Sequence, residues 1–182
     1  MATLPRFLIA AACMLLPTIN PPLLAQEPAP TPLPHVRSLS VAARELVAMG
    51  GARSALIRSF LDRLEASDLV VYVDVRWFAD TRMGQLAFMG SALETRYVVI
   101  QIACGRIVLD QLAALGHELR HAVEVADAAA VVDRGSLADH YTHIGMDVGS
   151  GSNRQFETEA AIDAGRRVKN ELAVHTRSRG DR

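Results

Sequence analysis

The chain has 182 residues, 50% of them hydrophobic, and a formal net charge of −1 at pH 7. This length and apolar content suit one packed domain and leave too little chain for two. The balanced charge provides no basic field, so it argues against nucleic acid and anionic lipid as partners.

Residues 1–25 have the features of a secretory signal peptide. Arg6 precedes an apolar run from Phe7 to Leu16, and small and proline-rich residues follow up to Ala25. A membrane anchor is the alternative, but a span needs about 20 apolar residues, and prolines interrupt this run. We therefore predict cleavage after Ala25, an exported chain that is secreted or periplasmic, and no membrane span in the mature chain.

Residues 26–37, QEPAPTPLPHVR, are proline-rich and lack periodicity, which predicts a stiff tether. Cleavage would also remove Cys13 and leave Cys104 as the only cysteine of the mature chain, so no intramolecular disulfide can form. We expect a single domain over residues 38–176 and a polar tail over residues 177–182.

The domain begins with a helical pattern and continues with strand patterns. Residues 40–66 have helical spacing, with a break at Gly50-Gly51. Three runs of β-branched and aromatic residues, each bounded by turn residues, predict strands. These runs cover residues 69–78, 86–90 and 96–103. Because the connections between them are short, we expect a small antiparallel or mixed sheet, packed on the helices that follow.

The second half of the domain returns to a helical pattern. The period resumes after Gly105 and ends at Arg134-Gly135, where a glycine suits the C-terminal cap of a helix. Residues 136–152 are expected to form a loop, and a last helix is expected over about residues 153–175. The order of elements predicts an α+β fold.

The first of these helices contains the sequence HELRH. Positions i and i+4 lie one above the other on a helix, so His117 and His121 can present two nitrogens to one ion, with Glu118 beside them. Zinc binds imidazole nitrogen, and a carboxylate near its open position can take a proton from water. The pattern predicts a zinc site with Glu118 as the general base. The alternative is that the histidines are only tolerated near a core.

A catalytic zinc usually has a third protein ligand. Asp127 is one candidate, because HELRHAVEVAD resembles the extended metzincin pattern. Glu124, however, stands where that pattern has a glycine, so the helix is expected to continue and carry Asp127 away from the metal.

The second candidate for the third ligand is Glu157. On a helix, Glu157 would begin an inward stripe of small and apolar residues, whereas Glu159 would lie on the solvated face. The members of the stripe are Ala161, Ala164, Val168 and Leu172. Since a buried carboxylate needs a partner, Glu157 is the preferred ligand. Stabilisation of the helix dipole is the alternative role for this residue.

HELRH followed by FETEAA resembles the gluzincins, zinc metallopeptidases in which a glutamate from a downstream helix completes the HExxH site. The resemblance covers roughly residues 96–170 and implies a zincin-like fold with His117, His121 and Glu157 as zinc ligands. Ala161 stands where the related segment has an aspartate, so any supporting role of that aspartate is absent or belongs to another residue.

Three further residues have two interpretations each. Glu124 falls on the metal-facing side of its helix, where it would orient a histidine by hydrogen bonding, or it is a solvated acid. Tyr141 and His143, in the expected loop, would donate to the oxyanion of the reaction, or they are surface residues. The strand YVVIQIACG would border the cleft and pair with an extended peptide, or it is an interior strand.

The sequence therefore predicts an exported peptidase of minimal size that uses Zn²⁺ and acts on a peptide or protein substrate. The alternative function is a non-catalytic scaffold or binding protein that retains zinc as a structural element.

Overall fold

The computed structural model describes residues 34–149 and 155–180, and it describes side chains as far as residue 173. The predicted signal peptide and residues 26–33 of the predicted tether lie outside the described residues. Within the described part of the chain, no helix has both the length and the apolar character needed to cross a membrane.

The main sheet has four strands in the order β1-β2-β4-β3. They are β1 (Val36–Ser38), β2 (Leu69–Arg76), β3 (Gly84–Ala92) and β4 (Thr95–Ala103). β2 lies parallel to both β1 and β4, and only β3 is antiparallel to its neighbour. The sheet is therefore mixed, which is one of the two arrangements expected, and not purely antiparallel. After β2 the chain first forms β3, which is not a neighbour of β2. β4 then lies between β2 and β3. Because β4 is antiparallel to β3, it runs in the same direction as β2. Val36 and Arg37, which were predicted to belong to the tether, form part of β1.

Five helices occur in the described residues: α1 (Val41–Arg53), α2 (Ala55–Glu65), α3 (Val108–Asp127), α4 (Arg134–Ile144) and α5 (Glu159–Gly180). The molecule is thus a mixed α+β fold. The break between α1 and α2 falls at Ser54, whose hydroxyl accepts from Ile57 N at 3.1 Å and caps α2. The predicted break at Gly50-Gly51 lies within α1.

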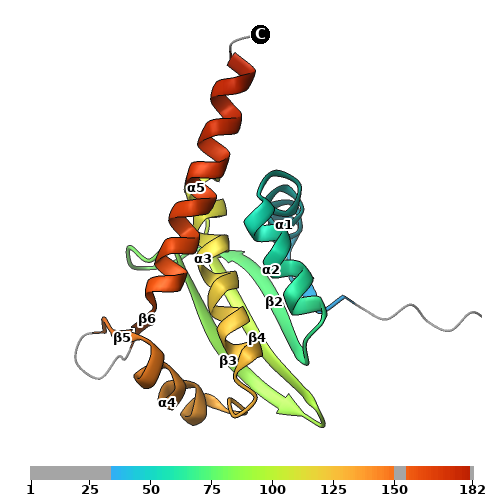
Figure 1. Ribbon diagram of the computed structural model, residues 1–182, viewed down its shortest axis with the longest axis vertical. Coiled ribbons are helices and arrows are strands. Elements are labelled where there is room, and N and C mark those ends of the chain that lie inside the picture. Colours follow the sequence, from blue (N-terminus) through green and yellow to red (C-terminus); the bar gives the residue numbers. More distant parts are fainter. Residues whose placement is uncertain (1–33, 150–154, 181–182) are drawn as a thin grey trace, which may run out of the picture. The chain divides into compact units, whose positions relative to one another are not determined.

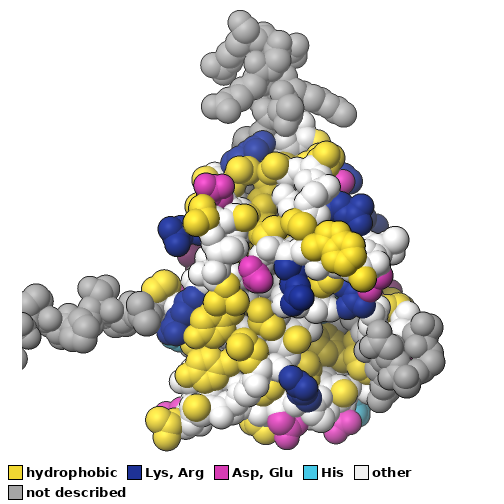
Figure 2. Space-filling view, turned by 180° about the vertical axis from the view of Figure 1, so that it is seen from behind, with side chains coloured by type: hydrophobic (Ala, Val, Ile, Leu, Met, Phe, Trp, Pro, Cys, Tyr) yellow, Lys and Arg dark blue, Asp and Glu magenta, His cyan; other side chains and the backbone are white. Residues whose placement is uncertain are grey.

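The core lies between one face of the sheet and the helices (Figure 1). Alternate residues of β2 and β4 point to this face and are fully buried, and so are three leucines of α3. These residues are Val71, Val73, Val98, Ile100, Ile102, Leu112, Leu115 and Leu119. Figure 2 shows the molecule from behind, where hydrophobic and basic side chains share the surface. The helices therefore cover one face of the sheet, and α3 lies directly on it.

The elements after α3 differ from the sequence prediction. α3 ends at Asp127, and Gly135 lies in the first turn of α4 rather than in a C-terminal cap. The signal for α4 is the reciprocal capping of Asp133 and Ser136, which starts a helix inside the expected loop. α5 begins at Glu159, later than predicted, and extends to Gly180, past the start of the predicted tail.

Arg96 fixes the C-terminal end of α3 to the sheet. Its side chain is only 5% exposed and donates to both carboxylate oxygens of Asp68. The same guanidinium donates to four backbone carbonyls around the end of α3, those of Val125, Ala126, Ala128 and Val131. The carbonyls of Val125 and Ala128 also accept from backbone amides. Arg96 therefore adds a charged donor to the turns that follow α3 and holds this end of the helix in place.

Candidate metal centre

The ligand group comes from α3 and from the short strand before α5. His117, His121 and Glu157 each offer one ligand atom, and these atoms lie within 4.8 Å of one another. Glu157 Oε2 lies 2.9 Å from His117 Nε2 and 3.8 Å from His121 Nε2. The structure thus brings together the three residues that the sequence predicted, and the group can hold a metal ion.

Glu157 lies on β6 (Phe156–Glu157), which pairs with β5 (Met146–Asp147). The prediction that a helix carries this residue is wrong, because α5 starts two residues later. Pairing of β6 with β5 gives Glu157 an extended backbone. The site is therefore completed by a strand that leads directly into a helix.

α5 places the ligand strand by packing against α3, as Figure 1 shows. The predicted inward stripe of α5 is buried and comprises Ala161, Ala164, Val168 and Leu172. A Cβ on Gly116 of α3 would meet Val168 Cγ2 at 2.6 Å, so the glycine allows the two helices to approach. Glu159 is exposed, as expected of the solvated face.

Glu118 is buried beside the ligand group, with 5% of its surface exposed. Its Oε2 has no hydrogen-bond partner among the described residues. Burial raises the pKa of Glu118 to about 7, although His121 and His117 act in the opposite direction. A buried carboxyl group with a free oxygen next to a metal-binding group is suited to accept a proton.

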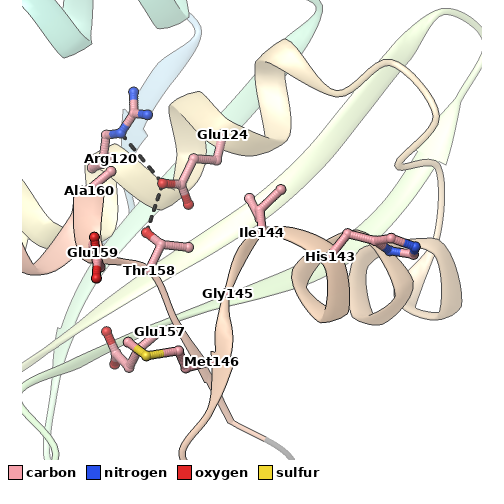
Figure 3. Close-up of a pocket in the computed structure, with 10 residues that line it drawn as sticks. All are labelled: Arg120, Glu124, His143, Ile144, Gly145, Met146, Glu157, Thr158, Glu159 and Ala160. Atoms are coloured by element: carbon pink, nitrogen blue, oxygen red, sulfur yellow. Dashed lines mark hydrogen bonds and ion pairs between the residues drawn. The ribbon is translucent and has the colours of Figure 1, made fainter.

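Glu124 connects α3 to the start of α5 (Figure 3). Its Oε2 lies 2.9 Å from His121 Nδ1, its Oε1 accepts from Thr158 Oγ1 at 2.8 Å, and Arg120 Nε lies 3.5 Å from Oε1. Burial disfavours the charged form, but hydrogen bonds from His121 and Thr158 hold the pKa of Glu124 below its usual range. Glu124 is thus a buried carboxylate that orients His121, one of its two predicted roles.

The other groups of the centre form one electrostatic unit. Burial opposes the charge on His121, yet hydrogen bonds to Glu124 and Glu157 raise its pKa to about 9. Burial also opposes the charge on Glu157, but hydrogen bonds from His117 and His121 lower its pKa to about 2. Two imidazoles and two carboxylates therefore compensate one another in a part of the protein where an isolated charge would be costly.

Tyr141 and His143 lie on α4 and not in a loop. Tyr141 is buried, and its hydroxyl lies 3.2 Å from His121 Nδ1 and donates to His121 O at 3.2 Å. His143 is exposed, and its Nδ1 lies 2.6 Å from Asp139 O of the same helix. In Figure 3 the ring of His143 points away from Glu124 and Glu157. Tyr141 therefore supports His121, whereas His143 is not brought to the ligand group.

A cleft of about 1050 Å³ opens over the centre. β3 forms one wall, and α4, β6 and α5 contribute to the others, with His117, Glu118 and His121 inside. β3 is one of the two edge strands of this sheet, while β4 lies between β2 and β3. The YVVIQIACG segment is thus an interior strand, the second of its two interpretations. β3, and not this segment, borders the cleft.

Alternate residues of β3 direct their backbone N–H and C=O groups away from β4, toward the free edge of the sheet. Ala103 N donates to Met83 O at 2.9 Å, so Met83 faces β4. In an antiparallel pair the direction alternates from residue to residue. The N–H and C=O groups of Gly84, Leu86 and Phe88 therefore point away from β4. Arg134 Nε donates to Phe88 O at 3.3 Å, which agrees with this register.

Asp127 lies where the sequence predicted, and two other residues near the site were missed. Asp127 forms an ion pair with Arg63 and does not join the ligand group, as the continuous helix implied. Thr158 and Gly84 were not recognised. Gly84 lies so near Glu118 that an added Cβ would stand 2.7 Å from Glu118 Oε1. Neither residue belongs to a motif, and both matter because of a contact across the fold.

Comparison with protein-family models, with curated proteins and with solved structures gives no match for this chain.

Proposed function

We propose that this protein is a zinc-dependent peptidase of the gluzincin type. The observation that carries the proposal is the convergence of His117, His121 and Glu157 on one point, with the buried carboxyl group of Glu118 beside them. Two imidazole nitrogens and one carboxylate oxygen are a ligand set typical of catalytic zinc. Bound zinc supplies Lewis acidity, which activates water and polarises a carbonyl oxygen.

Each residue has a specific role in the proposed reaction. His117, His121 and Glu157 hold the ion, and Glu124 keeps the Nε2 atom of His121 directed at it. Glu118 accepts the proton of the attacking water and then donates it to the leaving amine. Its free Oε2 supports both steps, because this oxygen has no other hydrogen-bond partner among the described residues and can take and return the proton.

A zincin-like fold is part of the same proposal. The support consists of an HExxH helix packed on a small sheet, an edge strand along the cleft, and a following helix whose start supplies the third ligand. Ala161 stands where the related gluzincin segment has an aspartate. In this chain Glu124 provides a buried carboxylate next to His121 in place of that aspartate. The departure therefore does not argue against the site.

The edge of β3 supports an extended peptide as the substrate. Gly84 and Leu86 direct backbone donors and acceptors into the cleft, and a peptide in extended form can pair with them as an additional strand. Such pairing recognises backbone and not side chains. It would place a peptide bond next to Glu118, because Gly84 contacts that carboxylate.

A structural zinc site in a non-catalytic scaffold is the competing function. Structural zinc is usually closed by four protein ligands, whereas this group has three within the described residues. The side chains of His117 and Glu157 are also 19% and 33% exposed and line the cleft. An accessible position next to a buried base favours catalysis over a structural role.

The test combines metal analysis with digestion of a broad peptide library. We expect about one zinc per chain after dialysis and cleavage by the wild-type protein. Glu118→Gln should keep the zinc, because Glu118 is not a ligand, and should lose all cleavage, because an amide cannot accept the proton.

Three results would contradict parts of this proposal. Background metal content in the wild type would remove the zinc site altogether. Stoichiometric zinc without cleavage of any library peptide would favour the scaffold function. Loss of zinc in Glu118→Gln would show that Glu118 is a ligand and that its role has been assigned wrongly.

A further inference from the structure

Thr158 lies at the junction between the third ligand and α5. It follows Glu157 directly, and it is 3% exposed. Its Oγ1 donates to Glu124 Oε1 at 2.8 Å and accepts from Ala161 N at 3.1 Å. The same hydroxyl therefore caps α5 and contacts the carboxylate that orients His121.

The direction of each hydrogen bond in this network follows from donor and acceptor capacity. An ionised carboxylate only accepts, so the Thr158 hydroxyl must donate its single proton to Glu124. The other oxygen of Glu124 then accepts from Nδ1–H of His121. With its proton on Nδ1, His121 presents a lone pair on Nε2, the atom nearer Glu157 Oε2. Thr158 thus helps to fix both the position of Glu124 and the tautomer of His121.

We propose that Thr158 is a positioning residue of the metal centre, which couples the ligand on β6 to the ligand on α3 through Glu124. A shift of the Thr158 backbone moves its neighbour Glu157, and a shift of its hydroxyl moves Glu124 and the ring of His121. The two ligand-bearing segments are consequently held in one relative position. The inference rests on the proposed metal centre but does not depend on peptide hydrolysis.

The competing role for Thr158 is N-terminal capping alone. Side-chain oxygens that cap helices commonly have no further function. Three substitutions separate the roles. Thr158→Val removes both the cap and the donor. Thr158→Ser keeps both. Thr158→Asp keeps an oxygen that can cap α5, but it places a second carboxylate against Glu124. An ionised carboxylate cannot donate a hydrogen bond to Glu124.

The experiment measures zinc affinity by competition with a chromophoric chelator, and the visible spectrum of the cobalt-loaded protein reports the ligand geometry. Loss of an outer hydrogen bond to a metal-ligand network typically weakens metal binding by about 10- to 100-fold. We expect a weakening in this range for Thr158→Val and Thr158→Asp, with altered cobalt spectra, and wild-type behaviour for Thr158→Ser.

Thr142→Val is the matched control. Thr142 is exposed on α4, and its hydroxyl donates to Ala138 O of the same helix at 2.8 Å. This variant should keep the wild-type affinity. The melting temperature of each metal-free variant reports its stability separately. Thr158→Asp should melt below wild type, because a second carboxylate beside Glu124 is costly at a position only 3% exposed, so zinc affinity is compared at a temperature at which every variant is folded.

Wild-type zinc affinity in Thr158→Asp would overturn the proposal and leave capping as the only role. If Thr158→Val does not fold, the comparison of Thr158→Asp with Thr158→Ser decides the question. A wild-type protein that binds zinc but cleaves no peptide would end the peptidase proposal and leave this inference standing, because its measurement is metal affinity.

Discussion

At the scale of single residues, Gly84 of the edge strand β3 lies close to Glu118. A Cβ at this position would lie 2.7 Å from Glu118 Oε1 and 2.9 Å from its Cγ. Contacts this short displace one of the two groups. A glycine here lets the strand come near the carboxyl group without moving it, so the edge strand and the base share one narrow space.

Gly84→Ala should therefore impair hydrolysis without loss of zinc. We expect a fall in kcat/KM of about 100-fold, which is the cost of a displacement of about 1 Å in a catalytic group. Gly90→Ala is the control, because Gly90 also lies on β3 and nothing stands within 4 Å of its added Cβ. Kinetics on a cleaved library peptide and zinc analysis of both variants test this. Equal activity of the two variants would show that Gly84 does not position Glu118.

Glu157 and Glu159 provide a second comparison of neighbouring residues. Glu157→Ala removes a ligand and should weaken zinc binding by several orders of magnitude. Glu159→Ala changes an exposed side chain and should alter the free energy of unfolding by less than about 0.5 kcal/mol, with zinc affinity unchanged. Competition with a chromophoric chelator measures both affinities. If the Glu159 variant loses zinc while the Glu157 variant keeps it, the ligand assignment is wrong.

At the scale of the elements, residue patterns within one segment predicted most helices and strands. Elements that depend on pairing between distant segments could not be predicted in this way. The helix with His117 and His121 and the three long strands follow from residue spacing alone. Residues 156–157 form a strand only because residues 146–147 lie beside them. Their local sequence favours the following helix, so the prediction extended that helix too far. α4 was missed because Gly135 was interpreted as a helix end, although Asp133 and Ser136 supply a helix start.

The direction of the strands was also beyond local reasoning. Short connections suggested antiparallel neighbours, and this holds for β3 and β4. β2 and β4 are instead parallel because β3 occupies the outer side of β4. The three residues of the candidate ligand group could be predicted from spacing and burial, since a buried carboxylate requires a partner. The contacts of Thr158 and Gly84 could not, because they depend on how separate elements meet.

The end of α3 is held by two arginines in different environments. Arg96→Met should lower the free energy of unfolding by about 3 kcal/mol or more, since it removes a buried charged donor that serves four backbone carbonyls and Asp68. Arg63→Met, which removes the ion pair with Asp127, should cost less than about 1 kcal/mol because both side chains are 49% exposed. Urea denaturation of the two variants measures the difference. Similar losses in both would contradict the role given to Arg96.

At the scale of the whole molecule, the proposed centre joins the two halves of the domain. α3 packs on the sheet, and β6 and α5 reach the ligand group from the C-terminal part of the chain. A ligand that binds only the folded protein stabilises it by an amount set by its concentration relative to Kd. Metal binding should consequently stabilise the complete domain and not only the ligand residues.

Zinc at 100 times its Kd should raise the free energy of unfolding by about 2.7 kcal/mol. The melting temperature of the wild-type protein should rise with added zinc and fall with a chelator, and Glu157→Ala should respond to neither. Differential scanning calorimetry measures both changes. A melting temperature that is independent of zinc in the wild type would contradict the linkage between the centre and the fold.

The free edge of β3 has a consequence for self-association. An edge strand that is open to a peptide is also open to the edge of another copy, and joined edges lead to aggregation. Two features shorten the open part of β3. The irregular register between Phe88 and Gly90 interrupts its pairing geometry, and Arg134 already occupies the carbonyl of Phe88. The remaining length suits a short extended peptide and is unfavourable for continued growth of a sheet, so the same edge can stay accessible while the protein stays dispersed.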